Sequence, residues 1–556
     1  MFDKSFEGLN GAELLVTCLE HAGVTHVFGI PGAKVDPVFE ALADSSIEVV
    51  VCRHEQNAGF MAGVMGRLTG RPGVCIGTSG PGTSNFCTAM ITATTEGDPV
   101  VCLSGAVPQR MRHQKTHQSM DNVGLMQPVT KFAHEVSSAD AVPELIAEAF
   151  RAALSPRQGA AYLSLPYDVM LAQASGGPLH MAPPSQGAAD SAAIERAVSM
   201  IEQATCPVLL AGMSATAPAA AEAFAGLLRD RPMPVVGTWE AAGLVPRDLL
   251  GCFFGRVGLF HNQPGDQLLS QADLIVTVGF DPVEYDPSIW NAGRQGAIVH
   301  IDAIESDSDV HYQPQEELVG DLASTIEAIR LGLGEIPSVD ERPGIEPIRS
   351  AVEAQRSLPA CHKAMPIHPA LLVGHVQAAV DDDTIVICDV GSHYIWMGRH
   401  FLCHRPRHLL FSNGQQTLGV ALPWAIGACL SRPEAQVLSM SGDGGFLFSA
   451  QALETAVRLG CNLTHLVWRD GRYDMVAFQQ RMKYGRDCGV DFGEPDIVAF
   501  AESFGAKGLR LETPDQLPEL IRTGMSMPGP VLIDVPVDYS DNIDLAKTMR
   551  ESPRSH

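Results

Sequence analysis

Two acidic side chains, Asp443 and Asp470, follow segments that are expected to be strands. Residues 436–441 form a short apolar run, typical of a buried strand, and Gly442-Asp443-Gly444-Gly445 comes directly after it. Residues 463–468 form a second such run, which ends just before Asp470. Neighbouring parallel strands end at one edge of a sheet, where open α/β folds bind ligands. We therefore expect the two carboxylates to lie close together at a binding edge.

The residue types around these carboxylates indicate a metal-bound diphosphate. Glycines let the backbone approach a phosphate, and a helix predicted over residues 446–459 would present main-chain N–H groups. Mg²⁺ is typically bound by a small number of carboxylates together with phosphate oxygens. A lone Gly-Asp-Gly is often only a turn, but the flanking strands and the second acid favour a binding site.

This segment resembles the thiamine diphosphate motif, in which Gly-Asp-Gly is followed, after a stretch of similar length, by Asn-Asn. Asp470 stands at the second Asn position and Arg469 at the first. The resemblance implies Mg²⁺ held by Asp443, Asp470 and the main-chain carbonyl of Arg472. It assigns no role to Arg469.

A third carboxylate, Glu55, lies where a predicted strand over residues 47–52 runs into a helix rich in Ala, Gly and Met. A glutamate at a helix start is often only a partner of the helix dipole. In thiamine diphosphate enzymes, however, a glutamate here hydrogen-bonds the aminopyrimidine ring and promotes ylide formation. Arg53-His54-Glu55 followed by Ala58 resembles that signature, which makes Glu55 the candidate catalytic acid–base group.

Alternating strand and helix patterns divide the chain into three segments, residues 8–171, 192–332 and 368–541. Loose stretches over residues 172–191 and 334–366 separate them. The pattern predicts the α/β class, with three consecutive, mostly parallel-sheet domains. The resemblance implies a pyrimidine-binding domain, a middle structural domain and a diphosphate- and Mg²⁺-binding domain. The predicted strands cover residues 24–30, 47–52, 73–78, 100–105, 161–165, 208–211, 274–279, 298–301, 384–388, 437–440, 463–468 and 531–535.

Composition excludes several classes of function. The 556 residues carry a formal net charge of −26, which argues against binding to nucleic acid or to anionic membranes. The 13 cysteines include no CxxC pair and are typical of free thiols in a reducing cytosol. The N-terminal residues have no targeting character, and no apolar stretch reads as a membrane span. We therefore expect a cytoplasmic protein.

Seven further runs extend the resemblance to nearly the whole chain. They are typical of the acetolactate synthases, and in particular of the catabolic type that works without FAD. The runs cover residues 29–34, 117–121, 254–260, 281–287, 412–419, 473–480 and 534–542.

The resemblance implies an activity and an assembly. Two pyruvate molecules would condense to 2-acetolactate and CO₂ through a hydroxyethyl carbanion on thiamine diphosphate. In the family the glutamate and the metal site come from different chains, so a homodimer or homotetramer is expected. Two alternatives remain: a related pyruvate decarboxylase or oxidase, or a non-catalytic subunit with the same fold.

The resemblance also names candidate site residues. Lys34, His117 and Gln118 would face the substrate beside Glu55, although Lys34 and His117 could equally be ordinary surface and loop residues. Leu418 or Met475 would be the bulky apolar residue that bends the cofactor. The complete set expected to bind the cofactor is Pro31, Gly32, Asn85, Gly391, Ser392, His393, Gln415, Leu418, Asp443, Gly444, Gly445, Tyr473, Met475 and Val476.

Two features argue against a dinucleotide. No GxGxxG segment opens a helix at the glycine-rich loops of the first segment. In the middle segment, Asp281 and Glu284 stand where the FAD diphosphate would lie in the anabolic synthases. Gln479 also replaces their tryptophan, which favours 2-ketobutyrate. We therefore expect no FAD and a purely structural middle domain.

Overall fold

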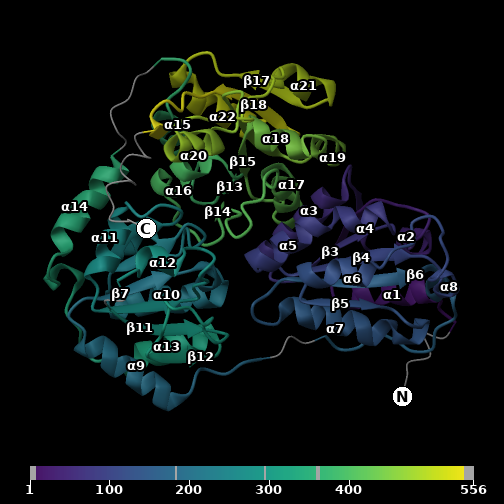
Figure 1. Ribbon diagram of the computed structural model, residues 1–556, viewed down its shortest axis with the longest axis horizontal. Coiled ribbons are helices and arrows are strands. Elements are labelled where there is room, and N and C mark those ends of the chain that lie inside the picture. The colour runs from purple at the N-terminus through teal and green to yellow at the C-terminus, as the bar shows by residue number, and fades with distance from the viewer. Residues whose placement is uncertain (1–7, 182–184, 294–295, 358–363, 544–556) are drawn as a thin grey trace.

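Three six-stranded sheets, one in each successive third of the chain, organise the protein (Figure 1). The computed structural model describes residues 8–181, 185–293, 296–357 and 364–543. All strand pairs within the three sheets are parallel, which confirms the predicted fold class. Within the described part of the chain, no helix combines the length and apolar character needed to cross a bilayer.

The first sheet has the order β2-β1-β3-β4-β6-β5. Its central strands β3, β4 and β6 are buried along their whole length, because helices cover both faces. The strands are β1 (His26–Gly29), β2 (Glu48–Val51), β3 (Gly73–Gly77), β4 (Val100–Ala106), β5 (Phe132–Glu135) and β6 (Ala160–Pro166). The helices are α1 (Gly11–His21), α2 (Asp36–Ala43), α3 (Glu55–Thr69), α4 (Pro81–Asn85), α5 (Cys87–Glu96), α6 (Asn122–Met126), α7 (Val142–Leu154) and α8 (Tyr167–Leu171).

The middle sheet has the order β9-β8-β7-β10-β11-β12, which is the 3-2-1-4-5-6 order of doubly wound nucleotide-binding folds. Its strands are β7 (Pro207–Ala211), β8 (Val235–Thr238), β9 (Phe253–Val257), β10 (Leu274–Val278), β11 (Ala297–Asp302) and β12 (Glu316–Val319). Its helices are α9 (Ser191–Gln203), α10 (Pro218–Asp230), α11 (Pro264–Gln271), α12 (Pro287–Trp290) and α13 (Leu322–Gly332).

The third sheet, β14-β13-β15-β16-β18-β17, repeats the strand order of the first, as an old duplication would. Its strands are β13 (Ile385–Cys388), β14 (Leu409–Leu410), β15 (Val437–Gly442), β16 (Leu463–Arg469), β17 (Lys507–Arg510) and β18 (Val531–Pro536). Its helices are α15 (Pro369–Ala379), α16 (Ser392–His400), α17 (Ala421–Ser431), α18 (Asp443–Ser449), α19 (Ala452–Leu459), α20 (Asp474–Tyr484), α21 (Ile497–Ser503) and α22 (Leu517–Ser526).

The structure corrects three expectations. The single helix expected over residues 446–459 is two helices, α18 and α19, and the first already begins at Asp443. The stretch 334–366, expected to be loose, contains α14 (Ile345–Arg356). Six short strands, β5, β8, β9, β12, β14 and β17, were not predicted; β5, β12 and β17 are half-exposed edge strands without an apolar run.

Helix α3 packs against α17 and joins the first domain to the third (Figure 1). The close approach requires Gly427, because a Cβ there would lie 2.5 Å from Val64 Cγ1 and 2.8 Å from the Met61 carbonyl oxygen. At the far end of α3, Arg67 donates a hydrogen bond to the Phe411 carbonyl at 3.0 Å. The two domains of one chain thus share a dry interface built on α3.

Candidate active site

The carboxyl ends of β15 and β16 lie side by side, as the sequence predicts for parallel neighbours. The carboxylate of Asp443 joins them: Oδ2 accepts the N–H groups of Asp470 at 3.2 Å and Gly471 at 2.8 Å. Its Oδ1 accepts the Gly444 N–H at 2.9 Å. Asp443 is 1% exposed, so this edge of the sheet presents a buried, oriented carboxylate.

A cavity of about 210 Å³ opens at these strand ends, and every residue that lines it belongs to the third domain. The cavity brings together most of the residues predicted for this half of the site. These are Gly391, Ser392, His393, Leu418, Asp443, Gly444, Gly445, Asp470, Arg472, Tyr473, Met475 and Val476. Six lining residues were not among the predicted site residues, Val390, Gln416, Gly442, Asp474, Gln479 and Tyr539. Four of them, Gln416, Asp474, Gln479 and Tyr539, stand inside runs that the resemblance had already singled out.

The walls of this cavity suit a phosphate group. The Nε2 atom of His393 is a buried polar atom without a partner among the described residues, and burial lowers the pKa of this imidazole to about 3. At Gly444 a Cβ would lie 2.6 Å from the Tyr473 ring, so only glycine leaves the backbone open there. The neutral imidazole of His393 is a donor that a diphosphate can use, and the glycines at the start of α18 leave room for it.

The part of this edge where a metal is expected, around Asp443 and Asp470, has several carboxylates and little compensating positive charge. Burial, with the neighbouring Asp443 and Asp474 carboxylates, raises the pKa of Asp470 to about 8. Burial also raises the pKa of Asp443, although its main-chain hydrogen bonds oppose this. Across the described chain, no three His, Cys, Asp or Glu side chains are arranged to hold a metal. Asp443 and Asp470 supply two carboxylates to this edge, a set that suits Mg²⁺ because that ion takes few protein carboxylates and completes its shell with phosphate and carbonyl oxygens.

The two arginines beside Asp470 point their charges elsewhere. Arg469 donates to the buried carboxylate of Asp534 at 2.8 Å and forms a second ion pair with Glu494. Arg472 forms ion pairs with Asp491 at 2.7 Å and Asp487 at 3.3 Å. Arg469 stands where the motif has its first Asn, and its ion pair with Asp534 links β16 to β18. The side-chain charge of Arg472 is neutralised by its two ion pairs.

Asp389 holds the loop that presents Leu418 to the cavity. Its carboxylate accepts the N–H groups of Gly419 at 3.0 Å and Ala421 at 3.2 Å. Burial raises the pKa of Asp389 to about 6, against the lowering effect of these hydrogen bonds. Both candidates for the residue that bends the cofactor, Leu418 and Met475, line the cavity, and the geometry does not choose between them.

The first domain assembles a separate group around Glu55. Glu55 is 8% exposed at the start of α3, and its Oε2 accepts a hydrogen bond from Asn85 Nδ2 at 2.9 Å. Oε1 faces Gly82, where a Cβ would lie 3.4 Å from it. Gln118 lies close by: its carbonyl accepts from Ser79 Oγ at 2.6 Å, and its backbone φ is +60°. Such conformations are typical of residues that a functional site constrains.

The remaining predicted residues are less closely joined to this group. Pro31 and His117 are exposed and Lys34 is half-buried; within the described residues none of them hydrogen-bonds to Glu55. Gly32 packs on Thr78, where a Cβ would lie 2.7 Å from the Thr78 Cβ. Gln415 lies outside the cofactor cavity and donates to Thr95 Oγ1 at 3.1 Å, whereas its neighbour Gln416 lines the cavity.

The middle sheet also has a crevice at its switch point, between the ends of β7 and β10, but Glu284 fills it. The carboxyl group of Glu284 accepts the N–H groups of Met213 at 3.0 Å and Asp281 at 3.1 Å. It also accepts from Thr238 Oγ1 at 2.5 Å. A Cβ on Gly212 would lie 2.4 Å from the Gly279 carbonyl, so the two loops are in contact. The Met213 and Asp281 N–H groups, which lie where the predicted dinucleotide diphosphate position would be, are therefore already occupied by the Glu284 carboxyl group.

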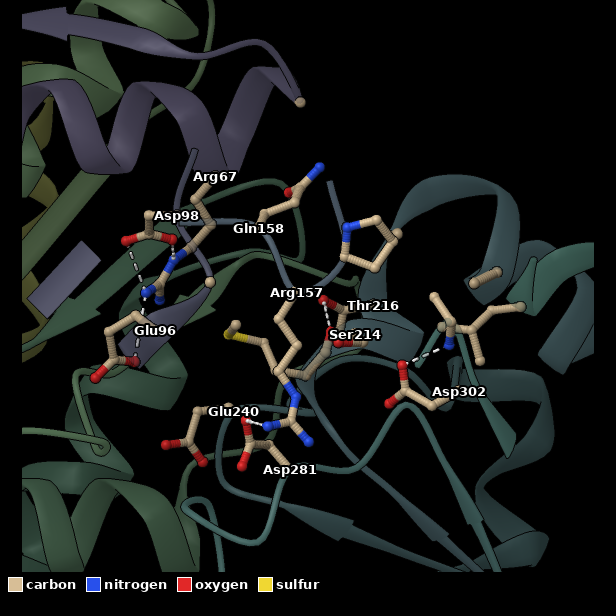
Figure 2. A pocket seen from close by; sticks show the side chains of 18 of the residues that line it. Arg67, Glu96, Asp98, Arg157, Gln158, Ser214, Thr216, Glu240, Asp281 and Asp302 are labelled. Carbon is tan, nitrogen blue, oxygen red and sulfur yellow. Dashed lines mark hydrogen bonds and ion pairs between the residues drawn. The ribbon is translucent and has the colours of Figure 1, made fainter. Parts of the chain in front are cut away.

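An acidic cavity of about 530 Å³ opens at this crevice, where the first and middle domains meet Arg407 and residues 409–411 of the third. Figure 2 shows Arg157 between Asp302 on one side and Glu240 on the other, with its guanidinium turned toward Asp281. Burial raises the pKa of Glu284 to about 8 and that of Glu240 well above its usual range.

Comparison with known proteins gives the chain three domain matches. Residues 9–125 match the N-terminal TPP binding domain of thiamine pyrophosphate enzymes, residues 194–329 their central domain, and residues 389–535 their C-terminal TPP binding domain. An acetolactate synthase of Bacillus subtilis (strain 168) is 51% identical over 98% of this chain and 96% of its own. A catabolic acetolactate synthase of Raoultella terrigena is 44% identical over 96% of each chain. The large subunit of acetolactate synthase isozyme 2 of Escherichia coli (strain K12) is 30% identical over 96% of this chain and 97% of its own.

Proposed function

Since the chain belongs to the family of thiamine pyrophosphate enzymes, we propose that it is an acetolactate synthase of the catabolic type, which condenses two pyruvate molecules to 2-acetolactate and CO₂. The full-length similarity to two acetolactate synthases carries the proposal. Fold and cofactor site alone would suit any enzyme of the family, a pyruvate decarboxylase or oxidase included. Glu55, Asp443 and Asp470 together argue against a non-catalytic subunit.

The third-domain cavity would hold the cofactor. Asp443, Asp470 and the Arg472 carbonyl would bind Mg²⁺, while His393 Nε2 would donate to the diphosphate and Ser392 and Gly444 would lie against it. When bound, thiamine diphosphate supplies the electron sink that 2-keto acid decarboxylation requires. The structure supports this through the partnerless His393 nitrogen and the open glycine backbone.

Glu55 would move the proton on which the cofactor's activation depends. Asn85 fixes one oxygen of its carboxyl group, which leaves Oε1 beside Gly82 to meet a ring nitrogen. A positioned acid–base group of this kind typically contributes about 10²–10⁴-fold in rate. Gln118, Lys34 and His117 would contact pyruvate, with the Lys34 ammonium attracting its carboxylate.

We further propose that the active site forms between two chains. Glu55 is not among the residues that line the cavity around Asp443. Large apolar side chains stay exposed next to that cavity, Phe448 at 50%, Val476 at 47% and Leu447 at 45%. A partner chain that places its Glu55 over this face would bury them and complete the site, as a homodimer or a pair of dimers.

Mixing two inactive variants tests this arrangement. Glu55→Gln and Asp443→Asn chains, co-expressed, should regain about a quarter of the wild-type activity, because half of random dimers would contain one intact site of two. Each variant alone is the control. If the two variants carry different affinity tags and mixed dimers are isolated through both tags, no recovery in those dimers would place both residues in the site of a single chain.

Two further points belong to the proposal. The enzyme would work without FAD, because Glu284 already occupies the N–H groups of the middle-domain crevice. It would act in the cytoplasm; every cysteine that the structure describes is free, which suits a reducing compartment.

Product analysis tests the proposed reaction. Purified protein is incubated with pyruvate, thiamine diphosphate and Mg²⁺ but no FAD, and the mixture is assayed before and after acid treatment. Acetolactate, detected as acetoin after decarboxylation, is the expected product. Acetaldehyde alone would assign the chain to the decarboxylases, and acetyl phosphate with peroxide to the oxidases.

A further inference from the structure

A basic cavity of about 500 Å³ lies where the three domains meet. We call it the three-domain cavity. In the first domain, Leu68 at the end of α3 lines it. The middle domain contributes one face of α10 and residues 243–246, and the third contributes Ile385, residues 406–408 and Arg432. The three-domain cavity shares no lining residue with the cofactor cavity.

Its charge is opposite to that of the molecule as a whole. Arg229, Arg407, His408 and Arg432 line it, and Glu222 is the one acidic residue among the described residues of its wall. The chain carries a formal net charge of −26, so a concentration of basic groups inside one cavity is locally unusual. Arg229 is partly neutralised by Asp248, 3.5 Å away.

Arg407 and Arg432 use only part of their hydrogen-bonding capacity. Each donates to a main-chain carbonyl in the last turn of α3, Arg407 to that of Arg67 and Arg432 to that of Leu68 at 2.9 Å. Their other guanidinium nitrogens have no hydrogen-bond partner among the described residues, and neither arginine forms an ion pair there. The cap on α3 therefore uses one nitrogen of each guanidinium group as a hydrogen-bond donor, and the other nitrogens are available to a ligand.

The positive charges in and around this cavity also repel one another, which disfavours the protonated forms of its basic groups. Burial, together with nearby Arg67 and Arg432, lowers the pKa of Arg407 to about 10, and Asp98 only partly opposes this. Burial and the charges of Arg405 and Arg432 lower the pKa of His408, against a weaker effect of Asp381. An anion in the cavity would relieve this repulsion.

The backbone at Arg407 adds an independent observation. Arg407 has φ +60°, one of three non-glycine residues with positive φ in the part of the chain that the structure describes. The other two, Gln118 and Gln416, belong to the two halves of the candidate active site. Strained residues of this kind gather at binding sites, where the surrounding structure holds them in place.

We propose that the three-domain cavity binds a phosphate-bearing anion, either inorganic phosphate or a phosphate monoester, through Arg407 and Arg432. Guanidinium groups match phosphate geometry with paired hydrogen bonds. The cavity volume exceeds that of a phosphate ion, so an organic group can be accommodated beside it. Because the walls come from all three domains, the bound anion joins them and stabilises their arrangement.

Calorimetric titration of the holoenzyme tests the site. Saturating thiamine diphosphate and Mg²⁺ occupy the diphosphate site, and inorganic phosphate or AMP is titrated at an ionic strength fixed with chloride. We expect one saturable site per chain, weakened at least about tenfold in Arg432→Gln. The matched control is Arg405→Gln, which removes a charge that pairs with Asp383 outside the cavity wall and should leave the affinity within about twofold. Tighter binding of AMP than of phosphate would identify a phosphate ester as the ligand, and equal binding inorganic phosphate.

A gain-of-binding variant guards against misfolding of Arg432→Gln, since Arg432 also caps α3. Glu222 is exposed and lines the same cavity, so Glu222→Gln should tighten phosphate binding severalfold by removing the one facing acid. Damage to the fold cannot produce that result. Absence of saturable binding in the wild type, or equal affinities in the wild type, Arg432→Gln and Glu222→Gln, would overturn the proposal.

Discussion

The third domain and the middle domain each end their parallel strands in a crevice, and a single carboxyl group distinguishes the two. In the third domain, Asp443 joins the ends of β15 and β16 by accepting the N–H groups of Asp470 and Gly471, and a cavity of about 210 Å³ stays open beside it. In the middle domain, Glu284 reaches across to Met213 and occupies its N–H group. Both crevices thus place a carboxyl group on main-chain N–H donors, and the open space beside Asp443 is where we propose that the diphosphate binds.

Among the substitutions that test this comparison, Asp443→Asn should have the largest effect, which is on the affinity for thiamine diphosphate. Loss of one anionic ligand should weaken Mg²⁺-dependent binding of thiamine diphosphate by at least about 100-fold, since even outer-shell changes at metal sites cost 10–100-fold. Titration calorimetry with and without Mg²⁺ measures the change. The exposed Asp515→Asn is the matched control. Unchanged affinity for thiamine diphosphate in Asp443→Asn would show that Asp443 does not bind the metal at this edge of the sheet.

Gly444→Ala should make the third-domain crevice resemble the closed one. The added Cβ would lie 2.6 Å from the Tyr473 ring, so the ring must move into the space of the ligand. Overpacking typically costs about 1–3 kcal/mol, roughly tenfold in cofactor affinity. Gly493→Ala, where a Cβ meets nothing within 4 Å, should bind the cofactor normally. Equal affinities in the two variants would show that the glycine backbone is not part of the site.

Glu284→Gln should change how stability depends on pH. Burial raises the pKa of Glu284 to about 8, so the folded chain holds a proton that the unfolded chain releases near its usual pKa. The wild type therefore loses stability as pH rises between the ordinary carboxyl pKa and about 8, by at most about 1.4 kcal/mol per pH unit from this group.

Melting temperatures measured across this pH range test the prediction. Gln cannot titrate, so the slope for Glu284→Gln should be shallower than for the wild type. The exposed Glu305→Gln should keep the wild-type slope. Parallel curves for the wild type and Glu284→Gln would show that this carboxyl group is ionised throughout.

Arg469→Gln should have the smallest effect on cofactor binding and turnover. Arg469 links β16 to Asp534, which is 1% exposed, but Arg510 contacts the same carboxylate at 3.0 Å. Because one partner remains, we expect a loss of about 1–3 kcal/mol in unfolding free energy and near-normal turnover. Denaturant unfolding and steady-state kinetics measure the two, with Arg522→Gln at an exposed ion pair as the control. A large loss of turnover at normal stability would give Arg469 a role in the reaction.

The sequence predicted the strands that carry the chemistry better than the elements around them. Strands β15 and β16 are buried and largely apolar, so their positions and the meeting of Asp443 with Asp470 followed from pattern alone. The break between α18 and α19 did not, because it accompanies a contact with another domain, the hydrogen bond of Ser449 to Asn57 at 2.9 Å. Arg469 likewise gained a role only when Asp534, distant in sequence, was placed beside it.

Contacts between distant segments also limited the prediction of the middle domain. Asp281 and Glu284 were expected near the diphosphate position because of their sequence context. Only the structure shows that the Glu284 carboxyl group itself takes the Met213 and Asp281 N–H groups. The distribution of site residues between two separated groups was inferred from family resemblance, and the observed cavity, lined by the third domain alone, is consistent with it.

Cofactor binding to the two crevices tests the central claim most directly. Purified protein is titrated by calorimetry, first with thiamine diphosphate in the presence of Mg²⁺ and then with FAD. One thiamine diphosphate per chain, dependent on Mg²⁺, with no detectable heat from FAD, is the predicted result. Saturable binding of FAD, or binding of thiamine diphosphate that persists in Asp443→Asn, would contradict the assignment of one open and one closed crevice.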